Sequence, residues 1–130
     1  MDEPIWISIA AVRQIHAELI REHGGSHGER DGGLIESALA RPRQKWTYED
    51  DADLCALAAA YAFGLAKNHG FVDGNKRVAF MTAYSFLGAN GLHLTAPEAD
   101  AYAVMVDLAS GELSEEDMAR WLRASVEPVE

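Results

Sequence analysis

The nine residues from His69 to Arg77, His-Gly-Phe-Val-Asp-Gly-Asn-Lys-Arg, bring several groups capable of chemistry into one short segment. They include an imidazole at His69, a carboxylate at Asp73 and an amide at Asn75, and they end in two cations, Lys76 and Arg77. Core packing does not require this combination. A base, a potential metal ligand and charge-neutralising groups are together the parts that phosphoryl transfer uses. The segment is therefore predicted to be a phosphate-handling site.

The glycines of this segment and the helix that follows it indicate how phosphate is bound. Gly70 and Gly74 allow backbone conformations that are closed to other residues, and the next helix is expected to begin at Asn75. The free N–H groups and the positive dipole end at a helix N-terminus favour an anion. The residues that begin this helix, Asn75, Lys76 and Arg77, are therefore predicted to bind phosphate. His69 is expected to face the phosphate as a proton acceptor.

Each of these residues also has a purely structural interpretation. His69 could bond the terminal carbonyls of a helix, Asp73 could cap a helix, and Lys76 and Arg77 could lie on a solvated face. Their combination within one segment is what favours a site. Phe71 differs from the others, because we expect its ring to anchor the loop in the core and so position its neighbours.

Two buried helices are predicted on either side of this segment. Residues 54–66 are apolar almost all round, and three aspartates at positions 50, 51 and 53 supply the negative charge that a helix start favours. Residues 78–87 continue as a second buried helix that stops at Asn90-Gly91. A helix that is apolar on every face must be covered by other helices, which predicts a compact all-α bundle.

Four more helices are expected around this pair, which makes about six in all. They are predicted at residues 8–23, from Leu34 to near Pro42, from Pro97 to about Ser110-Gly111, and after Ser114. Ser8 is suited to cap the first of them, and residues 114–117 approximate a capping box with Asp in the last position. The spacing of apolar residues is close to the helical repeat.

The segments between these helices are predicted to contain at most a minor strand or flap. Residues 24–33 hold five glycines and are expected to form a loop, which lacks the Gly-Lys-Ser/Thr ending of a P-loop. Residues 43–48 look extended, either as a mobile flap or as a solvated basic connector. Residues 92–95 are long enough for a connector or for one small strand.

Size and composition predict a single domain over residues 1–130. The chain is 48% hydrophobic and 25% charged, which suits one compact core. Its apolar runs are shorter than the roughly 20 residues that a membrane span needs. The N-terminus carries acids where a secretory signal carries positive charge. The lone Cys55 fits a reducing compartment and is expected to be a core thiol, so we predict a cytoplasmic protein.

The charge of the chain argues against direct binding of nucleic acid. The net charge is −10, with 9 basic and 12 acidic residues in positions 1–94, but 2 basic and 9 acidic residues in positions 95–130. Nonspecific nucleic-acid binding depends on Lys and Arg that neutralise backbone phosphates. Any affinity for phosphate must therefore be local.

The pattern His69-x-Phe71-x-Asp73-Gly74-Asn75-Lys76-Arg77 resembles the signature of the death-on-curing branch of the Fic family. The resemblance extends over roughly residues 9–123. It includes the helix before the Gly-Gly loop, the basic segment that ends in Tyr48-Glu49, and the turn at residues 110–114. The resemblance implies an all-helical Fic fold in which the loop and the helix N-terminus after it bind the phosphates of ATP, usually with Mg²⁺.

The resemblance also implies a role for individual residues. His69 resembles the base that activates a target hydroxyl, and Asp73 resembles the acidic residue at the metal and phosphate site. Gly74 and Asn75 match the anion-binding part of the loop. Lys76 and Arg77 are implied in both catalysis and phosphate binding. Lys76 replaces a glycine of the adenylyl-transferring members, and Arg77 matches their phosphate-binding arginine.

Two further positions depart from the adenylyl-transferring members. Gly70 stands where those members usually have a proline, and Phe80 stands where they have a second arginine. Both departures weaken an adenylylation function.

For the function, the resemblance implies the toxin of a type II toxin–antitoxin system. Such a toxin is an ATP-dependent protein phosphotransferase that modifies a threonine of translation elongation factor Tu, arrests protein synthesis and is neutralised by a cognate antitoxin. The alternatives are a Fic-type protein adenylyltransferase and a non-catalytic phosphate-binding regulatory module. Zinc hydrolysis is a weaker alternative, because Gly24-Gly25-Ser26 interrupts the helix that His23 and His27 would need and no third ligand is evident.

Overall fold

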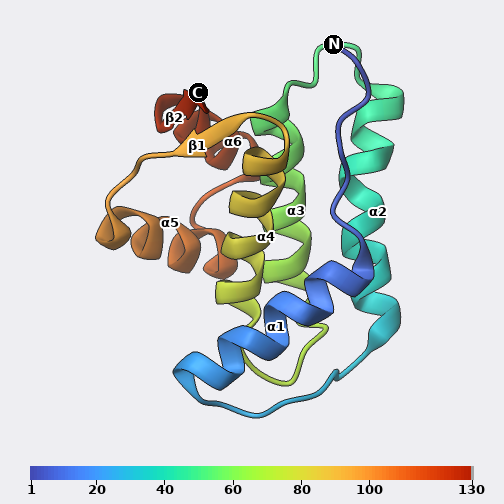
Figure 1. Ribbon diagram of the computed structural model, residues 1–130, viewed down its shortest axis with the longest axis vertical. Coiled ribbons are helices and arrows are strands. Elements are labelled where there is room, and N and C mark those ends of the chain that lie inside the picture. Colours follow the sequence, from blue (N-terminus) through green and yellow to red (C-terminus); the bar gives the residue numbers. More distant parts are fainter. Residues whose placement is uncertain (130) are drawn as a thin grey trace.

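A computed structural model describes residues 1–129 as six helices and two short strands (Figure 1). The elements are α1 (Ile9–His23), α2 (Gly32–Tyr48), α3 (Leu54–Asn68), α4 (Asn75–Ala89), β1 (Leu92–Leu94), α5 (Glu98–Ser110), α6 (Glu115–Ala124) and β2 (Val126–Pro128). The predicted all-α class is confirmed, and strands are confined to two segments of three residues each.

Helix α3 is the centre of the bundle and is in contact with α2, α4, α5 and α6. Eleven of its fifteen residues are buried, as its apolar composition on all faces predicts. At Gly64 the missing side chain lets α2 approach closely, because a Cβ there would lie 3.1 Å from both Cα and Cβ of Ala38. Helix α4 packs beside α3, and α1 contacts α4 and α2 at the end of the bundle where the α3–α4 loop lies (Figure 1).

The helix starts follow from short-range capping. The Ser8 hydroxyl accepts from the Ala11 N–H at 3.1 Å, and Ser114 accepts from the Asp117 N–H at 3.0 Å, so both predicted caps are confirmed. The capping box is only half formed, because the Asp117 carboxylate pairs with Arg120 instead. These caps satisfy N–H groups that the first helical turn leaves unpaired.

The predicted end of the second helix near Pro42 is wrong, as is the extended conformation of residues 43–48. Helix α2 runs unbroken from Gly32 to Tyr48, so two glycines assigned to the preceding loop are also helical. Pro42 has no main-chain N–H, so the helix lacks one hydrogen bond there. Its side chain is nevertheless fully buried within the bundle.

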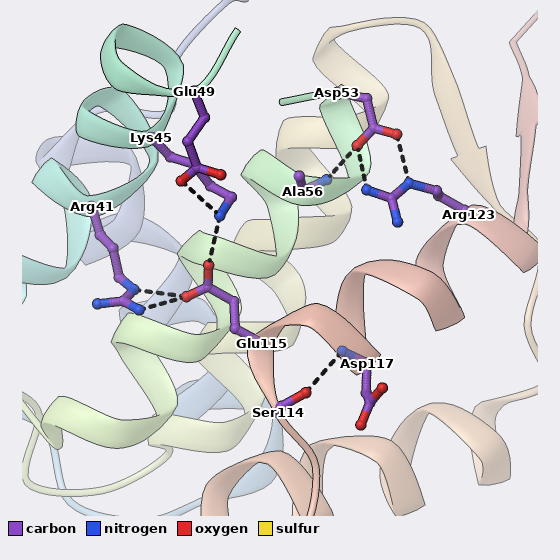
Figure 2. Close-up of polar contacts among 9 residues, drawn as sticks. All are labelled: Arg41, Lys45, Glu49, Asp53, Ala56, Ser114, Glu115, Asp117 and Arg123. Carbon is purple, nitrogen blue, oxygen red and sulfur yellow. Dashed lines mark hydrogen bonds and ion pairs between the residues drawn. The ribbon is translucent and has the colours of Figure 1, made fainter. Parts of the chain in front are cut away.

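The second half of α2 is held to α6 by ion pairs (Figure 2). Glu115 accepts from Arg41 at 2.7 Å and from Lys45 at 3.3 Å, and Lys45 also reaches Glu49 at 3.1 Å. Because Glu115 lies far away in the sequence, these contacts gave no local signal.

The segment 92–95 forms the small strand that was one of its two predicted outcomes. Strand β1 pairs antiparallel with β2, with Leu92 opposite Pro128 and Leu94 opposite Val126. The partner strand was not predicted. It depends on the chain returning after α6, which periodicity within a short window does not reveal.

Cys55 is a core thiol, as expected. It is 4% exposed, and burial raises its pKa to about 11. Over residues 1–129, no helix is both long and apolar enough to cross a membrane.

Candidate active site

The segment from His69 to Arg77 connects α3 to α4, as predicted. His69 ends α3 in the left-handed conformation, with φ 51° and ψ 48°, and it is the one non-glycine residue with positive φ in the described chain. Gly74 precedes α4 with φ 78°, and the helix begins at Asn75. The His69 side chain is exposed at this end of the bundle. A left-handed residue other than glycine is unusual enough to mark the position as constrained.

The N-terminus of α4 carries unsatisfied donors. No side chain caps it, whereas side chains of Ser8, Asp31, Asp53 and Ser114 cap four of the other helices. Within residues 1–129, the main-chain N–H groups of residues 75–77 donate to no protein acceptor, and the first turn contains no acid. Such a helix end attracts anions through its N–H groups and its dipole.

Two cations lie in the first turn of this helix. Lys76 and Arg77 are exposed, and neither is paired with a carboxylate in the described part of the chain. A cleft of about 210 Å³ between α2, α3 and α6 also holds cations. Its cations Lys45 and Arg123 are already paired with carboxylates (Figure 2). The cations at the start of α4 thus differ from those of that cleft in having no carboxylate partner among residues 1–129.

Asn75 uses its side chain within the loop itself. Its Oδ1 accepts from the Phe71 N–H at 3.1 Å, and its Nδ2 donates to the Phe71 carbonyl at 3.0 Å. Sequence reasoning placed Asn75 among the phosphate-binding residues. In this arrangement its main-chain N–H is what it offers to an anion, because both the oxygen and the nitrogen of its side-chain amide are bonded to Phe71.

Asp73 is part of the loop, and its carboxylate also contacts the glycine-rich segment that joins α1 to α2. Its Oδ1 accepts from the Gly74 N–H at 2.9 Å, and its Oδ2 accepts from the Ser26 N–H at 3.3 Å. Gly25 makes this approach feasible, because a Cβ there would lie 2.7 Å from Oδ2. Among residues 1–129, no cluster of three or more His, Cys, Asp or Glu side chains is placed to hold a metal ion.

The glycine-rich segment is held against the loop, although it was predicted only as a flexible connection. The Val72 N–H donates to the Gly28 carbonyl at 3.1 Å, and Glu29 forms a bridge with Phe71. Arg30 donates from Nε to the His69 carbonyl at 2.8 Å, so it anchors the main chain of that residue while the imidazole stays exposed. These partners are about 40 residues apart in sequence, which hid them from a local analysis.

The ring of Phe71 lies on the buried side of the loop, where it contacts His16, a residue that the sequence analysis did not single out. Phe71 is 2% exposed, and its ring stacks on the imidazole of His16 with centroids 4.0 Å apart and planes at 13°. His16 Nε2 is 2.9 Å from the main-chain oxygen of Asp73. The sequence contains one sign that His16 is special. It occupies the same helix face as Val12 and Ile20, where an apolar residue would be expected.

Across residues 1–129 the fold is thus an all-helical domain in which an uncapped helix N-terminus, two cations outside any ion pair and an exposed histidine lie together, an arrangement suited to attracting an anion. Comparison with known families identifies the class of protein. The model of the Fic/DOC family matches residues 6–87, and the chain belongs to this family.

Two curated relatives resemble the chain over different lengths. Over 75 residues it is 48% identical to Toxin Doc of Mycolicibacterium smegmatis, a match that covers 56% of this chain and 57% of that protein. Over 111 residues it is 36% identical to Protein kinase doc of Escherichia phage P1, with 84% of this chain and 86% of that protein covered. The first match thus spans little more than half of the relative's length.

Proposed function

We propose that this protein is the toxin of a type II toxin–antitoxin system that transfers a phosphoryl group from ATP to a hydroxyl of a translation factor, elongation factor Tu. The observation that carries the proposal is the uncapped start of α4, with Lys76 and Arg77 unpaired, next to the exposed His69. The names of the relatives, Toxin Doc and Protein kinase doc, support the same activity.

The proposed reaction uses each part of the site for one task. A ring nitrogen of His69 takes the proton of the target hydroxyl while the oxygen of that hydroxyl attacks the γ-phosphorus. The bond from the γ-phosphorus to the bridging oxygen breaks, and ADP leaves. The N–H groups at the start of α4, with Lys76 and Arg77, offset the negative charge on the transferring group and on the leaving diphosphate.

Mg²⁺ fits the site as a partner of the nucleotide. Magnesium is commonly bound by one or two carboxylates together with substrate phosphates, and not by a protein cage. Asp73 offers one exposed carboxylate, which agrees with the absence of a larger ligand cluster among residues 1–129. When bound, the ion would supply charge neutralisation between the phosphates. The Asp73 carboxylate would hold it there in exchange for its contact with Ser26.

Lys76 favours transfer of the γ-phosphoryl group over transfer of AMP. Adenylyl-transferring members have a glycine at this position, which leaves room for the inner phosphates. The long cationic side chain of Lys76 in the first turn of α4 fills that space and is expected to reverse the nucleotide, so that its γ-phosphorus faces His69. The proposal also places the protein in the cytoplasm with a cognate antitoxin as its partner.

The decisive experiment separates the two possible transfers. Purified protein and elongation factor Tu are incubated with ATP labelled either at the γ-phosphate or in the adenine. We expect the target to acquire only the γ-label, and Lys76→Ala to reduce the rate. Arg120→Ala is the matched control, because Arg120 is an exposed cation on α6 that is paired with Asp117.

Each other result points to a named alternative. Adenine label on the target would replace phosphorylation with adenylylation. Transfer of neither label, by protein that is folded and binds ATP, would favour a non-catalytic phosphate-binding module.

A further inference from the structure

A buried histidine contacts the α3–α4 loop from its inner side. His16 occupies one of three core-facing positions of α1, where Val12, His16 and Ile20 are 0%, 4% and 4% exposed. Burial costs an imidazole its hydration, so polar contacts must offset that loss. The contacts of His16 are with the loop, through the ring of Phe71 at 4.0 Å and the main-chain oxygen of Asp73 at 2.9 Å.

The hydrogen bond from His16 fixes the direction of one peptide group. A carbonyl oxygen only accepts, so Nε2 of His16 carries the proton and donates it to Asp73. The Asp73 carbonyl and the Gly74 N–H belong to the same peptide group, and the described chain has no cis peptide bonds. In a planar trans peptide the C=O and N–H groups point in opposite directions. Holding the carbonyl on His16 therefore sets where the Gly74 N–H points, which is toward Oδ1 of Asp73 at 2.9 Å, and so sets the direction in which α4 begins.

The second contact fixes the loop at its other end. Phe71 is held on one side by the stacked ring of His16 and on its main chain by the two hydrogen bonds of Asn75. Helix α1 also lies close to Gly74, because a Cβ there would be 3.3 Å from Ile20 Cδ1 and 3.8 Å from His16 Cδ2. His16 thus contacts the loop at Phe71, near its start, and at Asp73, two residues before α4.

We propose that His16 is a positioning residue that orients the Asp73–Gly74 peptide, and with it the N–H groups at the start of α4 that receive nucleotide phosphate. It acts through Phe71 and Asp73 without touching the nucleotide. This inference rests on the proposed function of that helix N-terminus as a nucleotide site.

Three variants separate positioning from general packing. His16→Leu keeps an apolar side chain but removes the donor, and His16→Gln restores an N–H donor. Val12→Ala is the matched control, because Val12 is fully buried one turn earlier on the same face of α1. For each variant we would measure the melting temperature, the dissociation constant for ATP with Mg²⁺, and the amide resonances of Gly74 and Asn75.

We expect His16→Leu to weaken ATP binding about tenfold, as the loss of a buried hydrogen bond predicts. It should also shift the Gly74 and Asn75 resonances, and His16→Gln should recover most of both effects. Val12→Ala should lower the melting temperature and leave both readouts as in the unmodified protein. Equal shifts in Val12→Ala, unchanged shifts in His16→Leu, or no recovery in His16→Gln would each overturn the proposal.

Two possible complications each leave one readout that still decides the role of His16. If the unmodified protein binds no ATP, the proposed function fails, while the amide resonances still decide the role of His16. If His16→Leu does not fold, the ring nitrogen signals of His16 in the unmodified protein decide it. A protonated Nε2 bonded to the Asp73 carbonyl supports the proposal, and an unprotonated Nε2 overturns it.

Discussion

Replacing His69 tests the proposed base, but the substitution must respect the backbone at this position. His69 has φ 51° and ψ 48°, and left-handed backbone costs most L-residues about 1 to 2 kcal/mol. Alanine would keep that strain, so a loss of activity could reflect a disturbed loop. Asparagine and glycine both tolerate the left-handed region, and neither side chain can take the proton. His69→Asn and His69→Gly are therefore the informative changes.

The expected magnitudes for stability and for catalysis differ widely. The His69 side chain is exposed, and its main-chain carbonyl keeps the 2.8 Å bond from Arg30 whatever the side chain is. The free energy of unfolding should therefore change by less than about 1 kcal/mol. Loss of a general base typically lowers the rate by about 10²- to 10⁴-fold, or about 3 to 5 kcal/mol of activation free energy.

The assay combines two measurements on the same preparations. Thermal melts report stability, and initial rates of γ-label transfer to elongation factor Tu at saturating ATP report the chemical step. Both variants should melt close to the unmodified protein and lose growth inhibition on expression. A folded His69→Asn protein that transfers label within tenfold of the unmodified rate would refute the assignment of His69 as the base.

Two other perturbations test the architecture around the site. Phe71→Ala should behave oppositely to the His69 variants and lower the free energy of unfolding by about 3 to 5 kcal/mol, as measured by denaturant titration, because the ring is 2% exposed. Asp53→Asn keeps a helix cap but removes the ion pair with Arg123. Burial alone would raise the pKa of Asp53, yet the hydrogen bonds from Arg123 and the Ala56 N–H outweigh it and leave the pKa below its ordinary value of 3.8. The stabilisation is thus fully present above that value and is lost as pH falls through the lowered pKa. Melts should show a loss of at most about 1 kcal/mol at neutral pH, since the pair is half exposed, and this loss should shrink as the pH falls below 3.8. A difference that persists in acid would contradict this.

Several features of this protein follow from its sequence alone, because the signals that set them act over a few residues. The largely apolar segments 54–66 and 78–87 placed α3 and α4, and Ser8 and Ser114 cap their helices through bonds that span three residues. The predicted site was also local, since its chemical groups lie within nine consecutive residues, and the structure brings that segment to one exposed loop and one helix start.

Only the tertiary structure decided what holds that loop in place. His16 bonds Asp73 across 57 residues of sequence, and Arg30 anchors His69 across 39. Helix α2 continues past Pro42 beside ion pairs to α6 that lie more than 70 residues away. Such contacts form only when the chain folds back on itself and brings both partners together. A short window of the sequence therefore does not reveal them. The local sequence therefore specified five of the helices and the chemical groups of the site, while long-range packing decided the extent of α2 and how the α3–α4 loop is held.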